Sequence, residues 1–391
     1  MVSLQDMEYA NKKDSGTEMD LYSTALHFRI FRQYGYNVPQ DVFRSYMDEM
    51  GEQFKVDADM DPNTMMQLFE ASHLALKDEN MLDEARIFCT KNLKSSNDIM
   101  PLHWKVEWYN TTRQISKQEN EERGPLNSKL LELAKLNFNM VQAEHQKDLI
   151  DILRWWRKLE LIENISFSRD RIVESFLWSV GVAFEPQHSR VRSWLTKAIT
   201  FIIVIDDVYD IYGSLQDLEI FTNAVVRWDP KEVEQLPSYN GWKSSGGTVL
   251  SLHVLLGLAQ HFSQVNDFLE NQQHLIYYSS LIIRLCNDLG TSTAELERGD
   301  VASCILCYMS KENVKEDVAR EHIKGMVMET WKKMNKHCFH NSSSLGPLMK
   351  YIMNMARVAH FIYQYGDGFG VQDRETRQQI LSSLVESLPL N

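Results

Sequence analysis

The segment from Ala198 to Tyr212 constrains the fold more than any other part of the chain. An apolar run over residues 199–205 leads directly into three carboxylates, Asp206, Asp207 and Asp210. On a helix, Asp210 would share a face with both other aspartates, about 4 to 6 Å away along the axis. Clustered carboxylates repel one another and need a cation to stay charged. Hard oxygen ligands of this kind favour Mg²⁺ over Zn²⁺.

Two simpler interpretations of this segment stay open at this point. Acidic residues often end a helix without binding anything. The β-branched residues in 199–205 also favour a strand, and a strand ending in Asp206-Asp207 would suggest a phosphoacceptor aspartate, Asp207, in an α/β fold. Such a fold needs strands that alternate with helices and glycine-bearing turns, which the rest of the chain does not supply. We therefore expect an all-α protein.

Composition narrows the classes of partner and site. The 391 residues carry a net charge of −13, which argues against a nucleic-acid partner. The five cysteines are odd in number and scattered, which fits a reducing compartment, and we interpret Cys304 and Cys307 as a helical core pair. No apolar run is long enough to be a transmembrane segment. The N-terminus has the pattern of neither a signal peptide nor a transit peptide.

Helical periodicity, interrupted at glycine and proline, accounts for most of the chain. Helices are expected over residues 21–34, 42–50, 64–77, 81–93, 126–159, 172–184, 218–227, 248–260, 268–288, 302–309, 314–336 and 345–365, with one from about 189 that carries the aspartates. The stretch 126–159 is expected to contain a break. We expect two helical domains, at 1–133 and 134–391.

A second polar row occurs in the segment Arg284 to Glu295. Asn287, Thr291 and Glu295 follow one another at intervals of four residues. One helical face would therefore carry an amide oxygen, a hydroxyl and a carboxylate over about 12 Å, with Arg284 on the same face. Three kinds of oxygen ligand in one row can chelate a hard cation. Alone the row would also fit a solvated polar face, but together with the aspartate cluster it indicates a metal site.

These segments resemble the class I plant terpene synthases. Asp206-Asp-Val-Tyr-Asp210 matches the D-D-x-x-D motif of that family, and residues 287–295 match its second metal motif, (N/D)-D-x-x-(S/T)-x-x-x-E. Arg169-Asp-Arg171 matches the R-x-R loop, and residues 177–187 also resemble family sequence. The resemblance covers nearly the whole chain and is strongest to the angiosperm monoterpene and isoprene branch. Because the second motif is not another D-D-x-x-D, it implies a lyase or cyclase rather than a chain-elongating prenyltransferase.

The resemblance implies a class I helical bundle preceded by an α-helical N-terminal domain. It also implies Mg²⁺ ions, three in the family, with Mn²⁺ as a substitute, which clamp the diphosphate of the substrate. The metal ligands that carry over to this chain are Asp206, Asp210, Asn287, Thr291 and Glu295. Asp207 and Asp288 belong to the motifs as lower-weight ligands that orient their neighbours. Asp206, Asp210 and Asn287 would bind the diphosphate through the metal.

Further residues carry over for the ionisation step. Arg169, Arg171 and Arg284 would bind the diphosphate and stabilise the negative charge that grows on it. Trp178 matches the pocket aromatic residue of the family and would stabilise the carbocation by about 1 to 2 kcal/mol through cation–π contact. An ordinary core tryptophan is the open alternative. Tyr363 and Asp367 precede a glycine-rich loop that the family folds over its site.

The substrate implied is a prenyl diphosphate, with geranyl diphosphate favoured and a monoterpene as product. Farnesyl and dimethylallyl diphosphates stay open, because pocket volume sets the chain length. The resemblance further implies a monomer, located in the plastid for a monoterpene synthase and in the cytoplasm otherwise.

The chain is shorter than the family pattern between the two metal motifs. From Asp206 to Asn287 it lacks roughly sixty residues, about two long helices and the start of a third at 1.5 Å per residue. The join is expected near residues 239–241, and the missing helices would form part of the pocket wall. A smaller loss is expected near 99–101, and the N-terminal domain begins late. A shortened isoform with impaired or no activity is therefore the alternative function.

Overall fold

Helices make up nearly all of the regular structure in the described part of the chain. The computed structural model describes residues 19–49, 53–55, 60–93, 100–119, 125–161, 168–207, 246–259, 261–298, 303–340, 346–369 and 374–390, of which 125–127, 294–298, 340 and 375 by backbone alone. Within these ranges there is one isolated β-bridge, Met47 to Phe54, and no strand. The all-α prediction is confirmed. The α/β alternative is wrong, because Asp207 ends a helix.

The described chain divides into two compact units. Unit 1 comprises residues 1–104 and 328–346, and unit 2 comprises 105–327 and 347–391. The domain limit at residue 133 stays a prediction, because compact units need not follow sequence domains. No helix in the described part of the chain has the length and apolar run that crossing a bilayer requires.

Unit 1 is built on short helices around a core of aliphatic and phenylalanine side chains. Its elements are α2 (Leu21–Gln33), η1 (Gln40–Tyr46), α3 (Pro62–Ser72), α4 (Asn80–Asn92) and η3 (Leu102–Trp104). Asp20 caps α2 by accepting a hydrogen bond from the Ser23 amide at 2.8 Å. The helix expected over 42–50 is wrong: a 3₁₀ helix follows Pro39 instead, and Met47 leaves it for the bridge.

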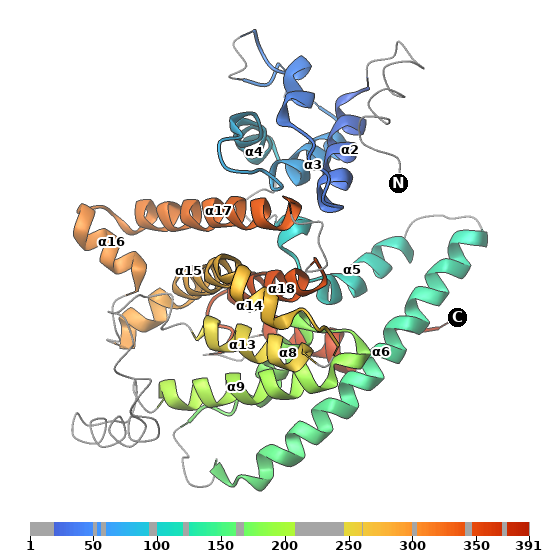
Figure 1. Cartoon of the computed structure of the whole chain (residues 1–391), viewed down its shortest axis with the longest axis vertical. Helices are drawn as coiled ribbons and strands as arrows, with labels where there is room; N and C mark the ends of the chain where they lie inside the picture. The colour runs from blue at the N-terminus through green and yellow to red at the C-terminus, as the bar shows by residue number, and fades with distance from the viewer. Residues whose placement is uncertain are drawn as a thin grey trace. The chain divides into compact units, whose positions relative to one another are not determined.

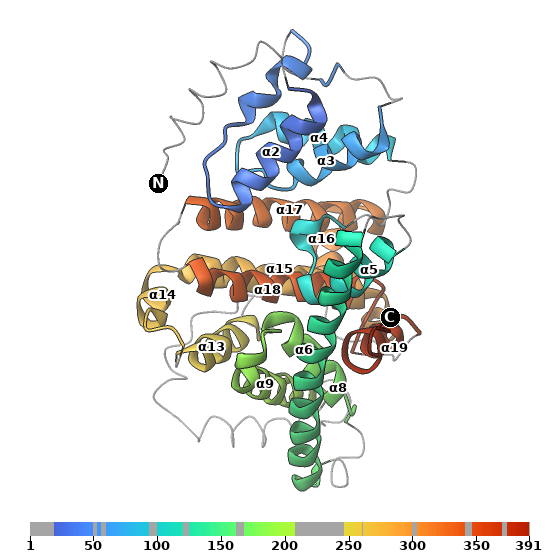
Figure 2. The same cartoon turned by 90° about the vertical axis from the view of Figure 1, so that its right-hand side faces the viewer.

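Unit 2 contains the longer helices (Figures 1 and 2). Its elements are α5 (Glu107–Glu119), α6 (Pro125–Lys158), α8 (Ile172–Val182), η4 (Pro186–His188), α9 (Ser189–Asp207), α13 (Gly247–Leu258), α14 (Val265–Asn271), α15 (Gln273–Arg298), α16 (Cys304–Glu312), α18 (Gly346–Tyr363), α19 (Arg374–Ile380) and the π-helical turn η6 (Leu381–Val385). Helix α17 (Glu316–His340) begins in unit 2 and ends in unit 1.

Two expected boundaries in unit 2 are wrong. Helix α6 is continuous, because it contains no glycine or proline after Pro125. The helix expected over 268–288 is two helices, α14 and α15, separated at Gln272. The helix expected at 218–227 lies outside the described residues.

Helices α8 and α9 form an antiparallel hairpin, and α13 packs against α9 (Figure 1). Helices α15 and α18 lie side by side in both views, and the Ser279 hydroxyl of α15 donates to the Ile352 carbonyl of α18 at 3.0 Å. The C-terminal end of α9, the start of α8 and the C-terminal end of α18 carry the residues that the sequence singles out.

Candidate active site

The C-terminal end of α9 presents two adjacent aspartates in opposite environments. One face of the helix is buried at intervals of four residues, by Val191, Leu195, Ile199 and Ile203. Asp206 is exposed at the end of this helix, whereas the Asp207 side chain is fully buried. Asp210 lies outside the described residues. The predicted cluster is therefore seen only in part, with one accessible carboxylate.

The buried Asp207 carboxylate is occupied by the loop before α8. Its Oδ2 accepts from the Ser168 hydroxyl at 3.0 Å and the Arg169 amide at 2.8 Å. Its Oδ1 accepts from Arg169 Nε at 2.7 Å and lies 2.6 Å from a terminal guanidinium nitrogen. Burial lowers the pKa of Arg169, but the hydrogen bond and charge of Asp207 outweigh it and raise that pKa. Asp207 thus holds the R-x-R loop and has little capacity left for a metal.

The same loop is bonded to the segment after α18. Arg169 lies 4.0 Å from Asp367 Oδ2, and Arg171 Nε donates to the Phe369 carbonyl at 2.6 Å. Asp367 in turn accepts from the Phe369 amide at 3.0 Å. The arginine loop, the end of α9 and the segment after α18 therefore form one bonded group.

Helix α15, like α9, carries a buried carboxylate next to a more accessible polar residue. Asp288 is fully buried, with Oδ1 2.9 Å from Arg284 Nε and Oδ2 accepting from the Cys304 amide at 2.7 Å. Asn287 is half-buried, and the Thr291 hydroxyl donates to its carbonyl at 3.0 Å. The α15 backbone continues through residue 295, but the Glu295 side chain lies outside the description.

Tyr363, the last residue of α18, packs against the middle of α15. Its hydroxyl is hydrogen-bonded to the Asn287 side chain. Burial raises the pKa of Tyr363 above its usual range, and the charges of Asp367 and Asp206 raise it further. A Cβ built on Gly290 would lie 3.1 Å from Tyr363 Cβ, so α15 and α18 are in close contact here. The second predicted polar row on α15 therefore lies beside the end of α18.

Oxygen donors dominate this site, and they fit a hard cation. Asp206 and Asn287 supply a carboxylate and an amide oxygen from two helices. The neighbouring thiols are not available as soft ligands, because burial raises the pKa of Cys286 and Cys304 above its usual range. The described side chains alone contain no group of three His, Cys, Asp or Glu residues that holds a metal. A complete ligand set would need residues beyond them, of which Asp210 and Glu295 are the predicted ones.

Trp178 forms an aromatic group with two residues of the α18 end. Its ring lies 5.9 Å from that of Phe369 at an interplanar angle of 28°, and 6.2 Å from that of Tyr363 at 71°. Trp178 is buried, and its Nε1 has no hydrogen-bond partner among the described residues. This arrangement places the predicted aromatic residue beside the segment after α18, which also binds the arginine loop.

Sequence reasoning missed several groups at this site. Ser168 stands directly before the R-x-R motif, and a polar residue at a loop end was the only signal available. The Phe369 carbonyl and the Cys304 amide are backbone groups, so no residue type announces them. All three fix the orientation of a predicted residue.

Comparison with known families accounts for the motifs. Residues 157–240 and 239–333 match "Terpene synthase family, metal binding domain", and residues 2–115 match "Terpene synthase, N-terminal domain". An α-farnesene synthase of Ricinus communis is 42% identical over 95% of this chain and 79% of its own length. The chain belongs to the terpene synthase family.

Other terpene synthases share the sequence and the fold. A chloroplastic myrcene synthase of Quercus ilex is 37% identical over 97% of this chain and 76% of its own length. Isoprene synthase from grey poplar, Populus x canescens, solved with three Mg²⁺ ions and dimethylallyl-S-thiolodiphosphate, superposes with a TM-score of 0.85. That structure is 32% identical, and the match covers 99% of this chain and 88% of that one.

Proposed function

We propose that this protein is a Mg²⁺-dependent class I terpene synthase, a lyase that ionises a prenyl diphosphate and releases diphosphate. The observation that carries the proposal is that both predicted motifs reach the segment after α18: Asp207 of α9 pairs with Arg169, which lies 4.0 Å from Asp367, and a Cβ on Gly290 of α15 would lie 2.8 Å from the Gly366 carbonyl oxygen. Polar residues from the end of α9 and the middle of α15 thus lie beside one segment. Membership of the family and the likeness to an isoprene synthase solved with three Mg²⁺ ions support the same conclusion.

The metal would be held between the end of α9 and the middle of α15. Asp206, Asn287 and Thr291 supply oxygens there, and Asp210 and Glu295 are the predicted additional ligands. When bound, Mg²⁺ supplies Lewis-acid stabilisation of the negative charge on the diphosphate. Asp207 and Asp288 act on the protein side, because each holds an arginine in place.

The arginines supply fixed positive charge to the leaving diphosphate. Asp207 orients Arg169, whose side chain remains 27% exposed and is therefore accessible to an anion. Arg171 anchors the loop through the Phe369 carbonyl, and Arg284 stands on α15 with 26% of its side chain exposed. Donors fixed before the reaction stabilise developing charge without reorganisation. Trp178 presents an aromatic surface to the cation that remains.

Geranyl diphosphate is the substrate that we favour, with a monoterpene as product and a plastid location. The myrcene and thujene synthases among the relatives are named as chloroplastic and support this choice. Farnesyl diphosphate is a second candidate, because two relatives, at 42% and 40% identity, are α-farnesene synthases. Dimethylallyl diphosphate is the third, by the likeness to isoprene synthase.

A shortened bundle with impaired turnover is the second candidate function. The metal-binding-domain match comes in two parts that adjoin at residues 239–240, near the join expected from the sequence. The alignment to the Ricinus relative runs over 451 positions, which requires gaps in a chain of 391 residues. Loss of helices from the pocket wall would admit water to the carbocation and lower the yield of hydrocarbon.

Incubation of the purified chain with geranyl, farnesyl and dimethylallyl diphosphates, with and without Mg²⁺, tests both candidates. Mg²⁺-dependent pyrophosphate release that EDTA abolishes is the expected result. The highest kcat/KM identifies the chain length, and gas chromatography with mass spectrometry identifies the product. Binding of Mn²⁺ and pyrophosphate without turnover would favour the impaired form. Absence of both binding and turnover would overturn the proposal.

A further inference from the structure

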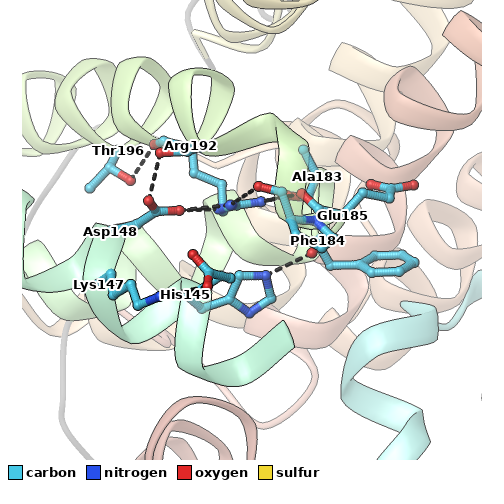
Figure 3. Close-up of polar contacts among 11 residues, drawn as sticks. His145, Lys147, Asp148, Ala183, Phe184, Glu185, Arg192 and Thr196 are labelled. Carbon is cyan, nitrogen blue, oxygen red and sulfur yellow. Dashed lines mark hydrogen bonds and ion pairs between the residues drawn. The ribbon is translucent and has the colours of Figure 1, made fainter. Parts of the chain in front are cut away.

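The turn between α8 and α9 is bonded more completely than its place at a helix end requires (Figure 3). The last carbonyls of a helix normally lack partners within the helix. Here the five successive carbonyl oxygens of residues 182–186 each accept from a side chain. The donors are Asn354 of α18, Arg192 of α9 and His145 of α6. Three helices are therefore joined at this turn.

Arg192 supplies most of these bonds. Its terminal nitrogens donate to the carbonyls of Ala183 and Glu185, both at 2.7 Å, and of Pro186 at 3.2 Å. Nε and one terminal nitrogen reach Asp148 Oδ2 at 2.8 and 2.7 Å. All five N–H groups of a fully buried guanidinium therefore have an acceptor. Lysine, with three N–H groups on one nitrogen, cannot reproduce this set.

His145 completes the turn as a neutral donor. Its Nε2 lies 2.7 Å from the Phe184 carbonyl, so the proton sits on that nitrogen. Burial lowers the pKa of His145 to about 3, and the charge of Arg192 lowers it as well. The ring packs edge-on against Trp108, with centroids 4.7 Å apart. His145 therefore stays neutral and bonded at physiological pH.

The hairpin that leaves this turn is held at two further levels. Midway along it, the Thr196 hydroxyl donates to the Ser179 hydroxyl at 2.9 Å. At its open end Asp207 binds Arg169. Asp206 is fourteen residues beyond Arg192, about 21 Å along the helix. A tilt of about 3° at the turn would move Asp206 by about 1 Å, a misplacement that can cost about 10²-fold in rate.

We propose that Arg192 is a positioning residue for the diphosphate-ionising site. By bonding the carbonyls of Ala183, Glu185 and Pro186 it sets the tilt of α9 against α8, and with it the position of Asp206. This role rests on the proposed function. Loss of Arg192 is expected to lower metal and diphosphate affinity as well as stability. The reason is that the open end of the hairpin, at Arg169, is partly exposed.

Unit 1 offers a matched control in Arg32. Its side chain is 1% exposed and forms an ion pair with Glu79 at 2.5 Å. It donates to the Val38 carbonyl at 3.0 and 2.7 Å and to the Leu74 carbonyl at 2.9 Å. Arg32 thus has the same chemistry as Arg192, and all of these partners lie within unit 1. Arg32→Met should lower stability without altering α9.

The test compares Arg192→Met and Arg192→Lys with Arg32→Met and the wild type in the full chain. Each is assayed well below its own Tm for kcat, for the Mg²⁺ concentration at half-maximal rate, and for calorimetric binding of Mn²⁺ with inorganic pyrophosphate. We expect Arg192→Met to lower kcat about 10- to 100-fold and to weaken Mn²⁺–pyrophosphate binding about 10-fold. Arg192→Lys should recover part of both. Arg32→Met should stay within about twofold of the wild type.

The outcomes separate this role from the proposed function. If the wild type binds Mn²⁺ and pyrophosphate and Arg192→Met binds them equally, Arg192 is only structural and the inference is wrong. If the wild type binds neither, the proposed function fails and the positioning role fails with it. Should Arg192→Met not fold, His145→Phe replaces it, because that variant removes a single donor to the same turn. Its expected loss in binding is about threefold, and unchanged binding would likewise overturn the inference.

Discussion

The C-terminal end of α9 and the middle of α15 are alike in one respect. Each carries two adjacent polar residues, of which one is fully buried and the other more accessible. On α9 the buried Asp207 holds an arginine, and the exposed Asp206 is left to face the site. On α15 the buried Asp288 holds an arginine, and Asn287 bonds Tyr363. In each motif one of the two adjacent polar residues is thus bound within the protein, and the other is the one that we propose for the ligand.

The two clusters differ in where their ion-pair partners lie along the chain. Asp207 bonds Arg169, which belongs to a loop on another segment and is itself close to Asp367. Asp288 pairs with Arg284 one turn away on its own helix. Damage to the α9 cluster should therefore spread to the arginine loop, whereas damage to the α15 cluster should reach no further than the start of α16, where Asp288 accepts from the Cys304 amide.

Loss of the exposed carboxylate is expected to have the largest effect on activity. Asp206→Asn should reduce Mg²⁺-dependent pyrophosphate release at least 100-fold, because it removes charge from the proposed metal ligand of α9. Its Tm should change by no more than about 1 °C, since exposed substitutions rarely exceed about 0.5 kcal/mol. A coupled pyrophosphate assay and a thermal melt check both. Retention of a tenth of wild-type activity would mean that Asp206 is not a ligand.

Removal of the buried acids should rank the two clusters by stability. Asp207→Asn leaves Arg169 without its partner and should cost about 2 to 4 kcal/mol, less than a fully buried pair would. Asp288→Asn should cost about 1 kcal/mol, because its amide oxygen can still accept from Cys304. Urea denaturation midpoints give the order. A larger loss for Asp288→Asn would reverse the distinction between distant and local bonding.

An added methyl group where α15 meets α18 should push these two helices apart. In Gly290→Ala the new Cβ would lie 2.8 Å from the Gly366 carbonyl oxygen and 3.1 Å from Tyr363, so α18 must shift. Activity should fall about 10-fold and stability by about 1 to 3 kcal/mol. Gly325→Ala is the control, because its Cβ meets nothing within 4 Å on α17 and should be neutral or stabilising by up to about 1 kcal/mol. Equal kinetics for the two variants would contradict the close contact.

Acid should lower the stability of the folded chain by the same amount whether or not the α9 cluster is intact. Burial lowers the pKa of His73 to about 4 and that of His145 to about 3. Both rings are neutral in the folded chain, whereas in the unfolded chain they are protonated below about pH 6.5. The stability that depends on these two histidines is therefore fully present above pH 6.5 and is lost progressively as the pH falls below it. At pH 5 each should cost about 2 kcal/mol. Wild type and Asp207→Asn should lose equal stability between pH 7 and pH 5, and unequal losses would locate the acid sensitivity in the cluster instead.

Spacing in the sequence identified α9 and α15 and the residues that they bring to the site. It did not separate Asp206 from Asp207, because adjacent aspartates differ only in what the folded chain packs against them. Nor did it reveal the bonded turn before α9, since its acceptors are backbone carbonyls. The break at Gln272 escaped notice because no glycine or proline marks it. Residue types and periodicity thus predicted the helices and motifs, while burial and backbone partners needed the structure.

The central claim is that the end of α9 and the middle of α15 bind one metal–diphosphate group together. Calorimetric titration of Mn²⁺ and pyrophosphate into the wild type, Asp206→Asn and Asn287→Ala tests it directly. We predict binding by the wild type and at least a 10-fold loss of affinity in each variant, although the two residues stand on different helices. Wild-type affinity in either variant, or no binding by the wild type, would contradict it.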